Sequence, residues 1–216
     1  MRQDKLKIGI FGGTFNPPHL GHLRLAEEAA SLHGLDRVLF VPCFIPPHKD
    51  SWDVALPADR LEMTARACAG NSLFHVSDIE IAARGPSYTV STLRALRNEG
   101  EHDNFFILGS DSLSEIHTWK DCWELFRLAN FIVVTRPGMD FETAWSAVPV
   151  DLKQQFRKVG ESLVHDRSLS LIPSPVRGLD VSSTRIRDLV RAGHSIRYLV
   201  TESVLAYIEE NLLYRK

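Results

Sequence analysis

Residues 12–22 read Gly-Gly-Thr-Phe-Asn-Pro-Pro-His-Leu-Gly-His and follow directly on the apolar run Ile-Gly-Ile-Phe at positions 8–11. The apolar run predicts a short strand, and the two glycines let the backbone turn tightly and come close to a ligand. The two prolines then stiffen the entry to a helical pattern. His19 and His22 are three residues apart, so we expect them to share one face of the first helical turn.

This stretch has the features of a phosphate site. At a helix N-terminus, free backbone N–H groups and the positive end of the helix dipole attract anions, and imidazoles add to them. A Gly-Gly turn alone would be an ordinary loop, and two histidines alone would suit a protein surface or a metal pair. Zinc needs a third and usually a fourth ligand, however, and no second Cys/His cluster at ligand spacing follows in the sequence. We therefore interpret the stretch as phosphate-binding.

A second helix start reads Val-Ser-Ser-Thr-Arg-Ile-Arg at positions 181–187. Ser182 or Ser183 is suited to be the N-cap. Arg185 and Arg187 place positive charge in the first turn, where cations oppose the helix dipole, so capping alone does not explain them. A helix start with solvated arginines is one interpretation, whereas an anion bound at this point would explain both arginines.

The composition excludes several classes of protein. The chain has 216 residues, 44% hydrophobic and 24% charged, with a formal net charge of −2, so we expect one soluble domain over residues 1–216, with the helical segment at about 182–216 part of it. This charge gives no electrostatic case for nucleic acid or anionic membranes as partners. The three cysteines are far apart and odd in number, which fits a reducing compartment. With neither a signal peptide nor a membrane span recognisable, we expect a cytoplasmic protein.

Strand-length apolar runs alternate with helical patterns along the chain. Strands are predicted at 7–11, 37–41, 74–79, 104–108, 130–135 and 168–172, and helices at 20–33, 58–69, 89–98, 184–192 and 201–214. This alternation predicts an α/β fold, a doubly wound parallel sheet with helices on both faces. Ligands bind at the carboxyl ends of such strands, where Gly12 and Gly109 would lie. Residues 137–166 show the least pattern, and we expect an irregular, partly helical excursion there.

The motifs resemble those of a known family. His19-Leu20-Gly21-His22 matches the HxGH signature of the nucleotidyltransferases related to class I aminoacyl-tRNA synthetases, and the longer string resembles bacterial nicotinate mononucleotide adenylyltransferases. The string at 182–187 resembles their second signature, SSTxIR, which closes over the β- and γ-phosphates of ATP. The resemblance implies a Rossmann-like fold and catalytic roles for His19, His22 and Arg187. It also implies that ATP or its phosphates contact a set of loop and helix-start residues, namely Gly12, Gly13, Thr14, Phe15, Ser182, Ser183, Thr184 and Arg185.

Two further loops follow predicted strands. Pro46-Pro47-His48-Lys49 would by itself suit an ordinary surface loop, but the family has a similar segment lining the phosphate region, which implies that His48 and Lys49 contact phosphate. Gly109-Ser110-Asp111 ends a buried strand, and an acid there either accepts hydrogen bonds from a ribose or caps the next helix. Related enzymes have GxD here against ribose, which implies that role for Gly109 and Asp111.

Aromatic segments distinguish the branches of the family. Trp119 alone would suit the core, but an aromatic ring can stack on a pyridine and a hydroxyl can orient its substituent. Segments similar to Ser87-Tyr88-Thr89 and to the stretch 111–119 form the pyridine pocket in pyridine-nucleotide adenylyltransferases, which implies that Tyr88, Thr89 and Trp119 bind the pyridine nucleotide. Relatives that use phosphopantetheine lack these segments. Cys43 departs from the family, since some relatives carry a polar amide residue there.

The resemblance implies a reaction that joins the phosphate of nicotinate mononucleotide to the α-phosphorus of ATP and gives deamido-NAD and pyrophosphate in NAD biosynthesis. Few acids lie in the motifs, so we expect no protein metal site, and Mg²⁺ held mainly by the phosphates. The alternatives are nicotinamide mononucleotide or phosphopantetheine as acceptor, or a nucleotide sensor without turnover. Nicotinate is favoured by the resemblance and because no acid is adjacent in sequence to Thr89 or Trp119. We expect a monomer or small homo-oligomer.

Overall fold

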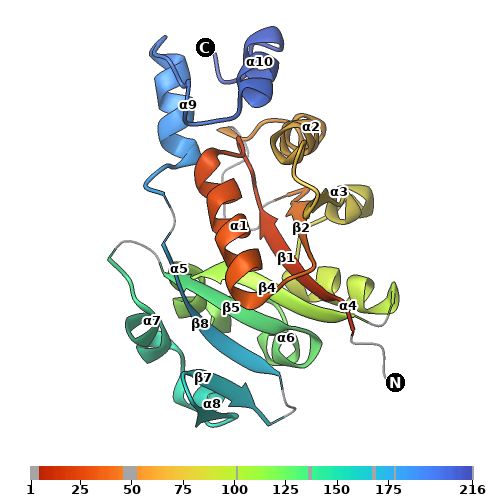
Figure 1. Cartoon of the computed structure of the whole chain (residues 1–216), viewed down its shortest axis with the longest axis vertical. Helices are drawn as coiled ribbons and strands as arrows, with labels where there is room; N and C mark the ends of the chain where they lie inside the picture. Colours follow the sequence, from red (N-terminus) through yellow and green to blue (C-terminus); the bar gives the residue numbers. More distant parts are fainter. Residues whose placement is uncertain are drawn as a thin grey trace.

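A computed structural model of the chain describes residues 5–45, 53–100, 102–135, 138–166, 169–177 and 179–215. Its centre is an eight-stranded sheet in the order β3-β2-β1-β4-β5-β8-β7-β6 (Figure 1). The strands are, in that order, Phe74–Val76, Arg37–Pro42, Lys7–Gly13, Asp103–Gly109, Asn130–Thr135, Ser170–Arg177, Ser162–His165 and Phe156–Val159. The six from β3 to β8 are parallel, which confirms the predicted α/β class.

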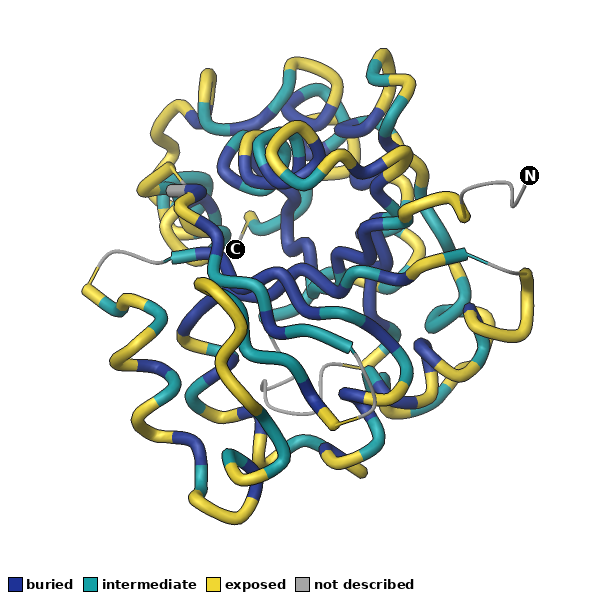
Figure 2. The backbone as a smooth tube through the Cα atoms, turned by 60° about the horizontal axis from the view of Figure 1, so that its bottom comes forward, coloured by how far each residue is buried: buried dark blue, intermediate teal, exposed yellow. Residues whose placement is uncertain are grey.

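Helices cover both faces of this sheet. Successive residues of a strand point to opposite faces, and Ile10 packs in one core with α4 and α6, whereas Phe11 packs in another with α1. Buried backbone, dark blue in Figure 2, therefore runs through the central strands between the two cores. The helices are α1 (Leu20–His33), α2 (Pro57–Cys68), α3 (Ile79–Ala83), α4 (Thr89–Asn98), α5 (Ser110–Ser114), α6 (Cys122–Leu128), α7 (Phe141–Ala147), α8 (Val150–Lys153), α9 (Ser183–Arg191) and α10 (Glu202–Glu210).

Local signals placed several helix ends correctly. Helix α1 has the predicted bounds and ends at Gly34, which is left-handed at φ 61° and ψ 46°. Ser182 is the N-cap of α9, and its hydroxyl accepts a hydrogen bond from the backbone N–H of Arg185 at 3.2 Å. No described helix combines the length and the apolarity that crossing a bilayer requires.

The stretch 137–166 is partly helical, as predicted, but it is not otherwise irregular. It holds α7, α8 and a hairpin in which β6 and β7 pair antiparallel, and β7 joins the sheet antiparallel to β8. The sheet is thus mixed, not wholly parallel. The two strands are joined by a turn that contains Gly160 at φ 59°. Because each strand has only four residues, neither contains the long apolar run that signals a buried strand.

Two more predicted elements are shorter in the structure. Strand β3 ends at Val76, whereas the predicted strand extended to residue 79, where the helix α3 begins in the structure. Helix α10 ends at Glu210, after which Leu212 and Tyr214 adopt positive φ and turn the chain back. Helices α2, α9 and α10 share a third apolar core, and Figure 1 shows α10 beside α2 and α9 close to the start of α1.

A buried arginine of α2 fixes the loops at the carboxyl edge of the sheet. Arg60 is 0% exposed, and its guanidinium donates to the carbonyls of Thr14 at 2.9 Å, Cys43 at 2.6 Å and Phe44 at 2.9 Å. Its Nε donates to the carbonyl of Ala55 at 3.0 Å. Thr14 follows β1 and Cys43 follows β2, so one side chain sets the distance between the two loops.

We expect Arg60→Met to lower the free energy of unfolding by about 3 kcal/mol or more, because it leaves several buried carbonyls without a donor. Urea unfolding followed by circular dichroism measures this. Arg66→Met is the matched control on the same helix, since the Arg66 side chain is solvated and contacts Glu62 and the Tyr207 ring instead of buried carbonyls. Equal stability of the Arg60 variant and the control would show that the carbonyl contacts contribute nothing.

Candidate active site

The two motif histidines form a stacked pair at the start of α1. His19 is the N-cap, 7% exposed, with φ −144° and ψ 169°. Its ring lies 3.6 Å from that of His22 between centroids, with 26° between the planes. The backbone N–H of His19 donates to Nδ1 of His22 at 3.2 Å, which leaves Nε2 of that ring as the donor atom. The shared face predicted from the spacing is confirmed, while the catalytic role of the pair stays a prediction.

Aromatic and imidazole rings pack closely against two glycines of the first motif. A Cβ on Gly13 would lie 3.1 Å from the ring of Phe15, and a Cβ on Gly21 would lie 3.0 Å from Nδ1 of His19. Phe15 has φ 49° and a side chain only 2% exposed, with its ring edge-on to His22 at 5.1 Å. A ligand can therefore reach Phe15 only through its backbone.

A cavity of about 650 Å³ opens at the carboxyl ends of β1 and β4. Three separate stretches of the sequence that were predicted to bind substrate line it, through Gly12, Gly13, Thr14, Tyr88, Thr89, Gly109 and Trp119. Trp119 stands edge-on to Phe106 with 6.1 Å between ring centroids, so one edge of its indole belongs to the core while the side chain still lines the cavity. The folded chain thus brings together the segments predicted for the nucleotide and for the pyridine.

Charged residues that sequence reasoning missed also line this cavity. Lys120 places its ammonium 4.4 Å from the centre of the Tyr88 ring. Glu80 and Glu115 line the cavity as well, and Glu80 accepts a hydrogen bond from the hydroxyl of Thr92 at 2.5 Å. No acid is adjacent in sequence to Thr89 or Trp119, but Glu115 of the stretch 111–119 lines the cavity, and folding adds Glu80. No sequence motif contains Glu80. It lines the cavity because the folded chain places α3, which follows β3, beside the other lining residues.

Other predicted residues lie outside the described lining of this cavity. Neither motif histidine lines it, and Asp111 is exposed in the first turn of α5. The N-cap of α5 is Gly109, so the capping alternative for Asp111 is wrong. His48 and Lys49 fall outside the described residues.

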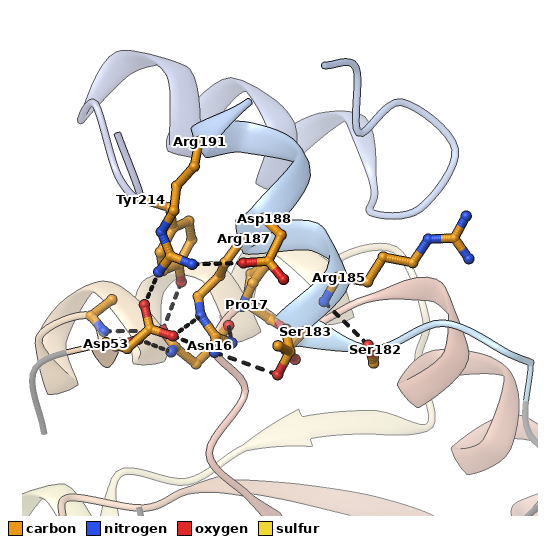
Figure 3. Close-up of polar contacts among 12 residues, drawn as sticks. Asn16, Pro17, Asp53, Ser182, Ser183, Arg185, Arg187, Asp188, Arg191 and Tyr214 are labelled. Carbon is orange, nitrogen blue, oxygen red and sulfur yellow. Dashed lines mark hydrogen bonds and ion pairs between the residues drawn. The ribbon is translucent and has the colours of Figure 1, made fainter. Parts of the chain in front are cut away.

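The start of α9 packs against the first motif (Figure 3). The hydroxyl of Ser183 donates to the carbonyl of Pro17 at 2.8 Å. Thr184 and Arg185 are exposed, and Figure 3 shows the Arg185 side chain directed away from the contacts drawn. The two arginines, predicted to face an anion together, therefore differ: Arg185 is in solvent, whereas Arg187 is half-buried and bonded within the protein.

Arg187 belongs to a polar cluster that we call the Asn16 cluster, made of Asn16, Asp53, Arg187, Arg191 and Tyr214 (Figure 3). Asn16, 3% exposed, donates to the carbonyl of Asp53 at 2.8 Å and accepts from the hydroxyl of Tyr214 at 2.9 Å. Burial raises the pKa of the Tyr214 hydroxyl, so it stays a neutral donor near neutral pH. Burial also lowers the pKa of Arg187 from its usual value. Only Asn16 and Arg187 of the five lie in recognisable motifs.

Comparisons with known proteins agree with this geometry. The cytidylyltransferase-like family matches residues 10–189. A protein of Geobacter sp. strain M21, named probable nicotinate-nucleotide adenylyltransferase, is 44% identical over 212 residues, covering 97% of this chain and 98% of the relative. A protein of Syntrophotalea carbinolica with the same name is 44% identical over 213 residues, with the same coverage.

A solved structure shares the fold. The nicotinic acid mononucleotide adenylyltransferase of Plasmodium falciparum, determined in complex with NaAD, superposes with a TM-score of 0.73 at 19% identity, covering 97% of each chain. A structure of the same protein complexed with APC gives a TM-score of 0.71. On the match over residues 10–189 and the near full-length relatives, the chain belongs to the cytidylyltransferase-like nucleotidyltransferases and, within them, to the nicotinate-nucleotide adenylyltransferases.

Proposed function

We propose that the stacked histidines and the neighbouring cavity are the site at which this protein transfers AMP from ATP to nicotinate mononucleotide, giving deamido-NAD and pyrophosphate. The observation that carries this is the His19–His22 stack at the N-terminus of α1, beside glycines that end β1. Helix N-H groups and two imidazoles there suit phosphate groups, and the adjacent cavity has aromatic walls suited to a pyridine. The reaction runs in a single domain over residues 1–216 of a cytoplasmic enzyme.

The chemistry needs positioning more than proton transfer. The attacking phosphate is already ionised near neutral pH, so no general base or covalent nucleophile is required. The barrier comes from bringing two polyanions together in line and from the charge that leaves with pyrophosphate. Fixed hydrogen-bond donors, positive groups and helix N-termini meet both needs. The His pair and the start of α9 are the described elements of that kind.

The residues divide into two halves of one site. In the nucleotide half, ATP contacts the backbone of Gly12, Gly13, Thr14 and Phe15. Gly109 and Asp111 contact its ribose. Its phosphates contact the start of α9, through Ser182, Ser183, Thr184, Arg185 and Arg187. His48 and Lys49 belong to this half by resemblance alone. The acceptor half takes Tyr88, Thr89 and Trp119, which line the cavity together.

A divalent metal accompanies ATP in nucleotidyltransferases, and we propose Mg²⁺. Among the described residues no three His, Cys, Asp or Glu side chains are grouped to hold a metal ion, which suits an ion bound mainly through substrate phosphates and water. The ion would neutralise phosphate charge as pyrophosphate leaves. We propose no nucleic-acid or membrane partner, and a monomer or small homo-oligomer.

The acceptor is tested by pyrophosphate release with ATP and a panel of acceptors. We expect nicotinate mononucleotide to be used roughly ten- to a hundred-fold better in kcat/KM than nicotinamide mononucleotide. The reason is that the Thr89 hydroxyl, nearby backbone N–H groups and the Lys120 ammonium offer donors to a carboxylate, while an amide leaves donors partly unmatched.

Equal or better use of the amide would instead point to Glu80 or Glu115 accepting its NH₂ group, and would assign the chain to a dual-specific branch. Turnover of phosphopantetheine in place of both would overturn the proposed acceptor. Binding of ATP without pyrophosphate release with any acceptor would identify a sensor.

We expect His19→Ala and His22→Ala each to lower kcat/KM at least 100-fold, about the loss of one preorganised donor to a developing negative charge. Steady-state kinetics measure this, with circular dichroism to verify folding. His33→Ala is the matched control: it lies at the far end of the same helix and bonds Ser174 at 3.0 Å. Near-normal turnover in both motif variants would remove the His pair from the reaction.

A further inference from the structure

Asp53 holds two arginines of α9 at once. Its Oδ2 accepts from Nε of Arg187 at 2.9 Å and from Nη2 at 2.6 Å, while Oδ1 pairs with Arg191 (Figure 3). The side chain of Asp53 is 20% exposed, that of Arg187 11% and that of Arg191 24%. Ion pairs at this depth are screened by salt less than those on the surface, and their geometry is held more firmly.

The Arg187 guanidinium is almost fully used inside the protein. Besides the two bonds to Asp53, Nη1 donates to the carbonyl of Asn16 at 3.0 Å and Nη2 to the hydroxyl of Thr184 at 3.4 Å. A guanidinium has five N–H donors, so these contacts leave about one for a ligand. Arg187 therefore acts largely on its protein neighbours in this arrangement.

Those neighbours come from both phosphate-binding elements. Asn16 precedes the His19–His22 stack by a few residues, and its side chain also bonds the backbone of Asp53 and of Ala55. Arg187 and Arg191 belong to the helix whose start carries the second signature. Asp53 is the anion that allows two arginines to converge here, because without it their charges would repel each other.

Resting on the proposed function, we propose that Asp53 is a positioning residue for the ATP half of the site. Asp53 orients Arg187 so that its guanidinium donates to the carbonyl of Asn16. This bond holds the start of α9 against the loop that leads into the His pair. The phosphate donors of the two motifs are then set at one spacing before ATP arrives, which lowers the cost of ordering them on binding. None of the Asn16 cluster residues is in the described lining of the cavity that contains Tyr88, Thr89 and Trp119, so we expect the effect to fall on ATP rather than on the mononucleotide.

The test replaces Asp53 with the isosteric Asn and measures the two substrates separately. For Asp53→Asn we expect the dissociation constant of ATP, titrated alone by calorimetry, to rise about tenfold, since charge-assisted hydrogen bonds are lost. The KM for ATP should rise by a similar factor, while the KM for nicotinate mononucleotide changes less than twofold. Asp53→Glu, which keeps the charge, should recover most of the ATP affinity.

Asp188→Asn is the matched control. Asp188 pairs with the same Arg191 at 2.8 Å, but it is exposed, and among the described contacts its carboxylate forms no hydrogen bond with Arg187. We expect it to bind and use both substrates like the wild type. If Asp188→Asn weakened ATP binding as much as Asp53→Asn does, the loss would be a general effect of removing a carboxylate near α9, and the proposal would be overturned.

Three other results would also overturn it. Unchanged ATP binding in Asp53→Asn would make the carboxylate dispensable, and tighter binding would mean that Asp53 competes with phosphate for Arg187. Equal losses for both substrates would show a merely structural role. Because ATP binding is titrated without acceptor, it answers this question even if the proposed acceptor is wrong.

A milder variant covers the case in which Asp53→Asn does not fold. Tyr214→Phe keeps every charge and removes one hydrogen bond, from the Tyr214 hydroxyl to Oδ1 of Asn16. We expect its ATP dissociation constant to rise about threefold, the worth of one neutral hydrogen bond, with the KM for the mononucleotide unchanged. Wild-type ATP binding in this variant would then decide against the proposal.

Discussion

The buried guanidinium of Arg60 is the constraint around which the carboxyl edge of the sheet is organised. A fully buried cation is tolerated only when hydrogen bonds replace its water, and here backbone carbonyls of three segments converge to do so. Ala55 joins this arrangement to the next, because its carbonyl accepts from Arg60 and its N–H donates to Asn16. Asn16 then presents its own carbonyl to Arg187. The helix that carries the second motif is thus located through a chain of contacts that begins in α2.

Sequence patterns revealed what depends on local chemistry. The bounds of α1, the left-handed Gly34 and the Ser182 cap follow from short-range preferences and were predictable. The facing of His19 and His22 follows from helical periodicity. The hairpin of β6 and β7 was not predictable in this way, because its strands are short and half-exposed, and they are stabilised by pairing with β8 rather than by their own pattern.

The candidate site shows the same division. Gly13, Thr89 and Trp119 lie in motifs, and the fold brings them to one cavity. Glu80, Asp53 and Tyr214 lie in no recognisable sequence motif. Tertiary packing alone brings them to the site. Even within a motif, one bound anion was expected to explain both Arg185 and Arg187, whereas Arg187 is half-buried against a carboxylate more than 100 residues away and Arg185 is exposed.

The bond between Asn16 and Tyr214 joins residues 198 positions apart, and that between Asn16 and Arg187 joins residues 171 apart. Contacts of such long sequence separation carry a larger loop-closure entropy than the contacts within local βα units. An opening limited to α9 and α10 would leave both cores around the sheet intact and would take apart only the nucleotide half of the site. Such an opening would remove the contacts that α9 supplies and keep the sheet native-like, so spectroscopic evidence of folding alone would not reveal it.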